Sequence, residues 1–128
     1  MESSPINQRL GVETEDLADG SVRLSLEVDA SLNNEVGVVH GGVASLLLDG
    51  AMGRACVRTL ATDESCATVQ LSVQFLARAE GRLEAHGRVI RRGRSVAFLE
   101  GECRRSDGVA VARAQGSWAI RAPRGAAE

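Results

Sequence analysis

The sequence predicts an α+β domain in which a curved antiparallel sheet of about five or six strands wraps around one long central helix. Two observations lead to this prediction. Segments in which apolar and polar residues alternate occur once before residue 40 and repeatedly after residue 65, as expected of half-buried strands. Between them, residues 41–60 place apolar side chains on nearly every face of a helix, so this helix is predicted to be buried.

The individual strands follow from the period of two. The alternating segments are 22–28, 69–75, 82–90, 95–103 and 109–120. Residues 91–94 and 106–108 contain turn-forming residues and are predicted to be hairpin turns. Residues 1–20 are polar and weakly patterned, with a turn signal at Asp19-Gly20, and are predicted to form a short helix or turn. The segment 32–39 is expected to be irregular, with at most a short strand.

The composition limits the classes of function. At 128 residues the chain is predicted to be one domain, 1–128, that is large enough to bury a stable core without disulfides or bound metal ions. A formal net charge of -2 and a pI near 5.7 argue against a nucleic-acid partner. Cys56, Cys66 and Cys103 are too widely spaced for a disulfide framework or a CxxC metal site. We therefore expect no metal and no cofactor.

The sequence also bears on localisation. The first twenty residues lack the basic and apolar regions of a signal peptide. The longest apolar segment, 43–60, is interrupted by Asp49, Arg54 and Arg58 and is not expected to span a membrane. With reduced thiols as the default, a cytoplasmic protein is expected.

The start of the helix and one carboxylate within it are the best candidates for a functional site. A helix start leaves about four N–H groups unpaired and carries about half a positive charge, so His40-Gly41-Gly42 can present donors to a developing oxyanion. Asp49 has no basic residue three or four positions away, and an unpaired carboxylate in apolar surroundings is unfavourable unless it has a function. The alternatives are that Asp49 faces solvent and that the glycines serve only a tight turn.

The order of strand, His-Gly-Gly, buried helix and long antiparallel strands resembles the hotdog fold. Over about residues 20–121 the chain resembles acyl-CoA thioesterases of the phenylacetate-degradation type (PaaI-like) and the related 4-hydroxybenzoyl-CoA thioesterases, which carry the carboxylate inside the helix. The match consists of Asn34 six residues before His40, Gly41-Gly42 at the helix start, Asp49 nine residues after His40, and Thr68 at the head of the next strand.

This resemblance implies hydrolysis of an acyl-CoA thioester. The position of Gly41 supplies the backbone N–H that polarises the thioester carbonyl, and that of Asp49 supplies the general base or the nucleophile. Asn34 and Thr68 match positions at which a polar residue orients water or the carboxylate, and both can form the hydrogen bonds required.

Further residues are assigned to substrate binding. His40 and Gly42 flank Gly41, and His40 is interpreted as holding the turn by a side-chain hydrogen bond rather than as a general base. The arginine-rich turn resembles the family's loop near the CoA nucleotide, the alternative being a solvated hairpin; it comprises Arg91, Arg92, Gly93 and Arg94. The only tryptophan, Trp118, is interpreted as core or interface packing.

The spacing of Gly41 and Asp49 predicts a homodimer. Eight residues at ~1.5 Å each separate them by about 12 Å along one helix, so both cannot contact one carbonyl group. If both act on one thioester, they belong to different subunits, with two helices side by side and antiparallel. The resemblance also implies a homodimer, often assembled as a dimer of dimers.

Two other functions compete with catalysis. One is a non-catalytic hotdog module that binds acyl-CoA as a sensor or scaffold. The other is a purely structural domain, which would not need a carboxylate at Asp49. The polar residues Asp49 and Thr68 favour the enzyme.

Overall fold

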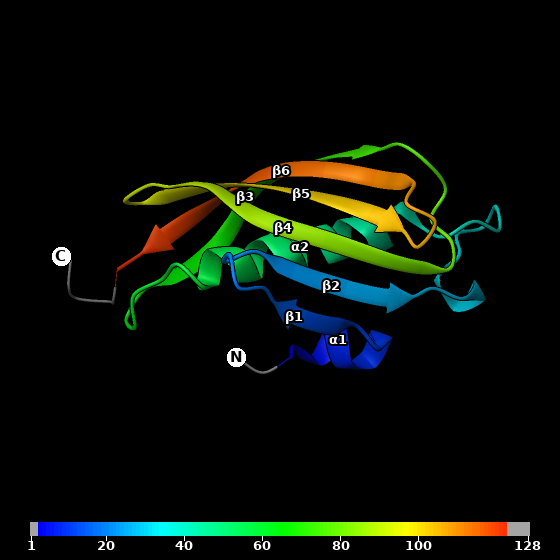
Figure 1. The fold of residues 1–128 in the computed structure, drawn as a ribbon, viewed down its shortest axis with the longest axis horizontal. Helices are drawn as coiled ribbons and strands as arrows, with labels where there is room; N and C mark the ends of the chain where they lie inside the picture. Colours follow the sequence, from blue (N-terminus) through cyan, green and yellow to red (C-terminus); the bar gives the residue numbers. More distant parts are fainter. Residues whose placement is uncertain (1–2, 123–128) are drawn as a thin grey trace.

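The computed structural model describes residues 3–122, which form a six-stranded antiparallel sheet wrapped around one long helix (Figure 1). The elements in chain order are α1 (Pro5–Leu10), β1 (Glu13–Asp16), β2 (Val22–Glu27), the 3-10 helix η1 (Ala30–Leu32), α2 (Gly41–Val57), β3 (Ser65–Phe75), β4 (Arg82–Arg92), β5 (Val96–Arg105) and β6 (Ala110–Arg121). The strand order is β1-β2-β4-β5-β6-β3, with every neighbouring pair antiparallel. The predicted α+β architecture is confirmed.

One face of α2 packs against the sheet and forms the centre of the core. Its buried residues recur at helical spacing: Ala44, Leu47, Leu48, Ala51, Met52, Ala55 and Cys56. Gly87 of β4 allows the helix to come close, because a Cβ atom there would lie 2.6 Å from the backbone of Ala51 and Met52. The buried face of α2 is thus fixed against β4 by backbone as well as side-chain packing.

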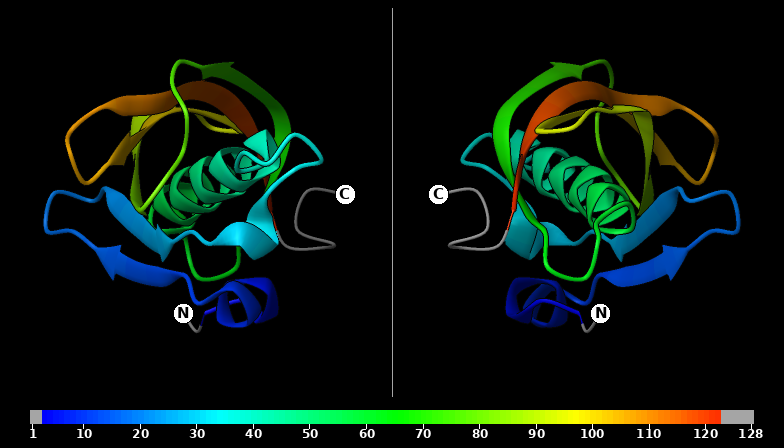
Figure 2. Two further views of the ribbon diagram at one scale, coloured as in Figure 1. Left: turned by 90° about the vertical axis from the view of Figure 1, so that its right-hand side faces the viewer. Right: turned by 90° about the vertical axis from the view of Figure 1, so that its left-hand side faces the viewer.

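The other face of α2 is not covered by the sheet. Figure 2 shows the sheet arching over α2 in both end views, with α1 on the opposite side. Val43, Leu46, Asp49, Gly50 and Gly53 are only partly buried. The helix predicted to be buried is therefore buried on its sheet-facing side, while apolar and small residues also line its open face.

Most strand boundaries agree with the alternation, but β1 was not expected. Its sequence, Glu-Thr-Glu-Asp, has no apolar alternation, because it lies at a sheet edge and is held largely by polar contacts. Arg23 of β2 pairs with Glu15 at 2.7 Å, and Arg54 of α2 binds both carboxylate oxygens of Asp16 at 2.7 and 3.0 Å. Such long-range pairs leave no local pattern in the sequence.

The segments on either side of α2 are also defined. The segment 32–39 contains the end of η1 and an isolated antiparallel bridge between Asn33 and Val39. The helix predicted to reach about residue 60 ends at Val57, and a turn follows in which the Thr59 hydroxyl donates to the Cys56 carbonyl at 2.7 Å. Of the predicted lead-in, residues 1–2 lie outside the described part of the chain.

Across residues 3–122, none of the helices combines the length and the apolar character that crossing a membrane requires.

Candidate active site

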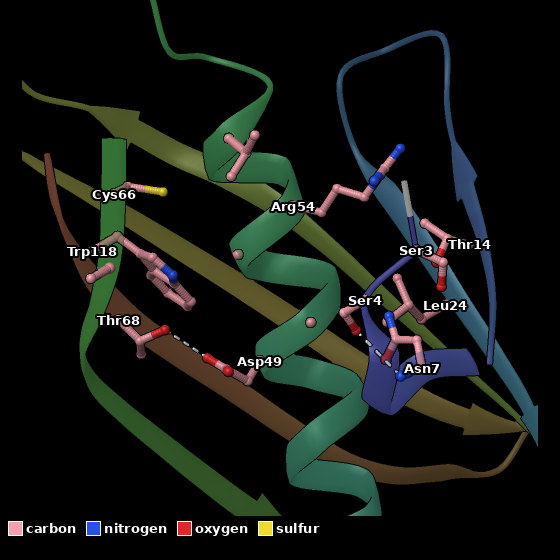
Figure 3. Close-up of a pocket in the computed structure, with 14 residues that line it drawn as sticks. Ser3, Ser4, Asn7, Thr14, Leu24, Asp49, Arg54, Cys66, Thr68 and Trp118 are labelled. Carbon is pink, nitrogen blue, oxygen red and sulfur yellow. Dashed lines mark hydrogen bonds between the residues drawn. The ribbon is translucent and has the colours of Figure 1, made fainter. Parts of the chain in front are cut away.

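The centre of the candidate site is a hydrogen bond between a strand and the open face of α2. The Thr68 hydroxyl donates to Asp49 Oδ1 at 2.9 Å (Figure 3). Asp49 is partly buried on α2, and Thr68 belongs to β3. This bond holds one oxygen of a carboxylate that also lines a pocket.

A β-bulge determines the direction of Thr68. In the alternation, Val69 shares a face with Leu71, which would turn Thr68 away from the helix. The register of β3 against β6 shifts between Thr68 and Gln70, and Val69 is 68% exposed. Thr68 therefore lies opposite Trp118, whose side chain is buried on the helix side of the sheet. Bulges commonly redirect side chains next to active sites.

The carboxylate opens onto a pocket of about 300 Å³ that crosses α2. Residues of β3 and β6 lie on one side of α2, and residues of α1, β1 and β2 lie on the other (Figure 3). Gly50 and Gly53 of α2 also line the pocket. The lining residues are Ser3, Ser4, Asn7, Thr14, Leu24, Asp49, Gly50, Gly53, Arg54, Val57, Cys66, Ala67, Thr68 and Trp118. A mostly apolar lining with a few polar groups is typical of a small-molecule site.

The start of α2 presents one free backbone donor. His40 is the N-cap, and its Nδ1 accepts the N–H of Gly42 at 2.8 Å, as expected of a residue that holds the turn. The N–H of Gly41 makes no hydrogen bond to any residue among 3–122. The ring of Phe75 lies over Gly41, where an added Cβ would be 3.1 Å from the ring. Gly41, rather than Gly42, therefore retains a donor for an external acceptor.

Asn34 has a local role in the loop before α2. Its Oδ1 accepts the N–H groups of Val36 at 3.0 Å and Val38 at 3.3 Å, and its backbone N–H donates to the Val38 carbonyl. Within residues 3–122 it makes no hydrogen bond to Asp49 or Thr68. The structure thus places Asn34 in the turn that leads to His40 and leaves only its amide nitrogen for another partner.

The arginine-rich turn contains residues in two different states. Arg92 pairs with Glu64 at 2.5 Å and donates to the Gly93 carbonyl at 2.8 Å, so its guanidinium joins the turn to the loop before β3. The side chains of Arg91 and Arg94 are exposed and form no ion pair with any residue in the range 3–122. Of the three arginines in this turn, only Arg91 and Arg94 therefore have side chains available to an anionic ligand.

The cysteines do not supply a nucleophile from the core. Burial raises the pKa of the Cys103 thiol to about 12. Burial, together with the neighbouring Cys66 thiol, also raises the pKa of Cys56 to about 12, so both thiols stay protonated at neutral pH. Among residues 3–122, no cluster of three or more His, Cys, Asp or Glu side chains could hold a metal ion.

The structure thus brings some of the proposed site residues together and separates others. Asp49 and Thr68 meet, and His40, Gly41 and Gly42 form the start of the same helix, seven to nine residues before Asp49. The predicted site lacked α1, Gly53 and the indole of Trp118. No sequence pattern indicates that α1 contributes to the pocket. For Trp118, the only indication is weak: it is the one tryptophan of the chain and shares a strand face with other inward residues.

Comparison with known proteins decides the family. A model described as the thioesterase superfamily matches residues 36–112, which include α2, β3, β4 and β5. The chain belongs to the thioesterase superfamily. Solved structures described as a thioesterase family protein and a "putative thioesterase" share its architecture, so the predicted hotdog fold is confirmed.

Three relatives of this thioesterase superfamily member illustrate the similarity. A protein of Halobacterium salinarum named "Putative esterase" is 38% identical over 96 residues, or 71% of this chain and 64% of that protein, so the match spans under two thirds of the relative. A phenylacetic acid degradation-related protein from Ralstonia eutropha, described as a "putative thioesterase", has 30% identity and a TM-score of 0.83, covering 92% of each chain. A Bacillus halodurans protein solved with CoA has 26% identity and a TM-score of 0.86, covering 95% of this chain and 82% of that one.

Proposed function

We propose that this protein hydrolyses an acyl-CoA thioester to the free acid and CoA. The observation that carries the proposal is the carboxylate of Asp49, held by Thr68 at 2.9 Å on the open face of α2 and beside a largely apolar pocket. Family membership supports thioester hydrolysis in general, and the relative solved with CoA supports CoA as the thiol part of the substrate.

The chemistry requires one carboxylate and one donor. The N–H of Gly41 receives the carbonyl oxygen as it gains negative charge. Asp49 either takes a proton from water, whose oxygen bonds to the carbonyl carbon, or attacks that carbon itself to form an anhydride that water then cleaves. In both routes the C–S bond breaks and CoA leaves as a thiolate, which needs little acid assistance because thiol pKa values lie near 8.5.

The two groups act together in a homodimer. Gly41 and Asp49 are separated by about 12 Å along α2, so one chain supplies half of each site. β3 lies at a sheet edge, with Thr68 beside Asp49 near one end and Phe75 over Gly41 at the other. An antiparallel pairing of two β3 edges about a two-fold axis brings the Gly41 end of one chain to the Asp49 end of its partner.

The remaining expected residues have supporting roles. Arg91 and Arg94 are exposed at the β4–β5 turn and are suited to the phosphates of the CoA nucleotide. Asn34 acts through the loop that leads to His40 and Gly41, with its amide nitrogen available to water at the assembled site. A dimer of dimers is the expected larger assembly.

The test is release of free thiol from a panel of aliphatic and aryl acyl-CoAs, followed with a thiol reagent. We expect turnover by the parent protein and loss of nearly all turnover in Asp49→Asn, which keeps the shape and the Thr68 contact but lacks the carboxylate charge. Binding of acyl-CoA should persist in this variant.

Two results would contradict the proposal. Asp49→Asn turnover within a few-fold of the parent would exclude the carboxylate as the reacting group. Binding of acyl-CoA without thiol release from any member of the panel would identify a non-catalytic acyl-CoA-binding module instead.

A further inference from the structure

Trp118 lies beside the proposed catalytic pair without taking part in it. It is the only tryptophan of the chain, and it lies opposite Thr68 in the pairing of β6 with β3. Only 2% of the residue is exposed, yet it lines the pocket next to Asp49 (Figure 3). Its indole fits the space above Gly116, where an added Cβ would meet the ring at 2.8 Å.

The indole N–H of Trp118 has no acceptor among the residues 3–122. Buried indole N–H groups usually find a hydrogen-bond partner, so this one requires an explanation. The described part of the chain contains no fully enclosed side-chain nitrogen or oxygen without a partner, which means that this nitrogen opens onto a space. Nε1 is directed at Gly53, where an added Cβ would lie at 3.5 Å, and both residues line the pocket.

We propose that Trp118 determines specificity by donating a hydrogen bond from its indole Nε1 to an acceptor oxygen carried by the acyl group. The inference rests on the proposed thioester hydrolysis at Asp49 and names a class of substrate for it: acyl groups with a hydroxyl, keto or ether oxygen away from the thioester. A site built to bond such an oxygen discriminates against analogues without it, because the buried donor is then left unpaired.

Helix geometry gives an expected position for that oxygen relative to the reacting carbon. Gly53 follows Asp49 by four residues, one helical turn, or about 6 Å along α2. An extended chain advances roughly 1.2 Å per bond. The acceptor is therefore expected about four to six bonds from the carbonyl carbon, and an oxygen on the second or third atom of the acyl group would not reach Nε1.

The pocket is suited to an acyl group of this kind. Leu24 and Val57 provide apolar surface along its length, and the bare backbone of Gly50 and Gly53 leaves room for the substrate over the helix. α1 bounds the pocket on one side with Asn7 and the preceding Ser4, and the space of about 300 Å³ suits a compact acyl group.

The first test compares matched pairs of thioesters that differ by one oxygen. Benzoyl-CoA is compared with its 2-, 3- and 4-hydroxy derivatives, and hexanoyl-CoA with 5-hydroxyhexanoyl-CoA. We expect the parent to favour the 3- or 4-hydroxyl and the 5-hydroxyl compounds in kcat/KM. In Trp118→Phe, which keeps an aromatic ring but lacks the donor, that preference, measured as the ratio of kcat/KM within each pair, should fall about three- to tenfold.

Gly53→Ala provides a second variant that does not endanger the fold. Its methyl group fits at 3.5 Å from Nε1 and occupies the place of the acceptor, and alanine favours a helix interior over glycine. We expect loss of the oxygen preference without a lower melting temperature. Loss of selectivity in this variant therefore cannot be attributed to unfolding.

A direct readout is the indole N–H resonance of Trp118, which is the only one in the protein's ¹H–¹⁵N spectrum because the chain has one tryptophan. In Asp49→Asn, 4-hydroxybenzoyl-CoA should shift this resonance downfield and benzoyl-CoA should not.

The outcomes separate this inference from the proposed function. Equal effects of Trp118→Phe on both members of every pair, or an indole resonance that responds alike to both ligands, would overturn the specificity role while thioester hydrolysis stands. Absence of thiol release from all members would instead reject the proposed function.

Discussion

Gly41 is the residue whose role can be isolated most cleanly. It is the first residue of α2, its N–H has no partner among residues 3–122, and His40 before it is extended, with φ -59 and ψ 134. Proline is tolerated at a first helical position and requires an extended residue before it. Gly41→Pro therefore removes the proposed oxyanion donor and leaves the helix intact.

We expect Gly41→Pro to lower kcat by about 10²–10³, the effect of deleting one oxyanion donor. Gly41→Ala is the matched control, since it places a Cβ at the same 3.1 Å from Phe75 but retains the N–H. It should stay within a few-fold of the parent in the same thiol-release assay. Similar losses in both variants would show that the contact with Phe75, not the donor, is responsible.

Thr68 is expected to act through Asp49. Thr68→Val keeps the shape but removes the donor to Oδ1, so kcat should fall about ten- to hundredfold with little change in KM, because hydrogen bonds to charged groups contribute about 1.5–3 kcal/mol. Thr68→Ser retains the hydroxyl and should recover most of the activity. A raised KM with unchanged kcat in Thr68→Val would assign the residue to binding alone.

The sequence predicted the identities of the central pair better than their geometry. Asp49 follows from its residue type and spacing and Thr68 from the family resemblance, and the structure joins them by a hydrogen bond. The bulge at Val69 could not be predicted, because alternation alone turns Thr68 to the opposite face. The unpaired indole of Trp118 depends on contacts between β6 and α2, which are far apart in the sequence.

At the scale of elements, the arginines of the β4–β5 turn are expected to have different roles, Arg91 and Arg94 in ligand binding and Arg92 in stability. Replacing both Arg91 and Arg94 by Glu should raise KM for acyl-CoA about tenfold with kcat nearly unchanged, because the nucleotide is remote from the reacting carbon. The same thioesters of pantetheine, which lack the phosphates, should be hydrolysed equally well by parent and variant. An equal rise in KM for both thiols would exclude phosphate binding.

Arg92→Gln is the control for this turn. Its guanidinium is paired with Glu64, and both side chains are less than one quarter exposed, 24% and 22%. We expect a lower melting temperature and an unchanged KM.

The elements differ in how visible they are in the sequence. In β2, α2 and the later strands, the apolar residues recur at the spacing of a buried strand or helix face, so these elements were predicted to within a few residues. β1 was missed because an edge strand held by ion pairs has no such period. The open face of α2 could not be predicted, because its partly exposed apolar residues have the same pattern as core residues.

At the scale of the whole molecule, the separation of Gly41 and Asp49 along α2 predicts a two-fold assembly with two equivalent sites. Each site takes Asp49 and Thr68 from one chain and Gly41 from its partner. The long free edge of β3, with Val69 exposed in it, is the surface that such an assembly covers. A strictly monomeric but active protein would be incompatible with this arrangement.

The most direct measurement of this claim mixes two inactive variants, Asp49→Asn and Gly41→Pro, by unfolding and refolding them together in equal amounts. In mixed pairs, one site receives both intact groups and the other receives neither, so random assembly restores about a quarter of the parent turnover. The parent treated in the same way gives the reference, and different affinity tags on the two variants confirm that mixed assemblies form. Recovery of about a quarter of the turnover is the result that a site shared between chains predicts. Turnover no higher than that of the separate variants, with mixed assemblies present, would contradict it.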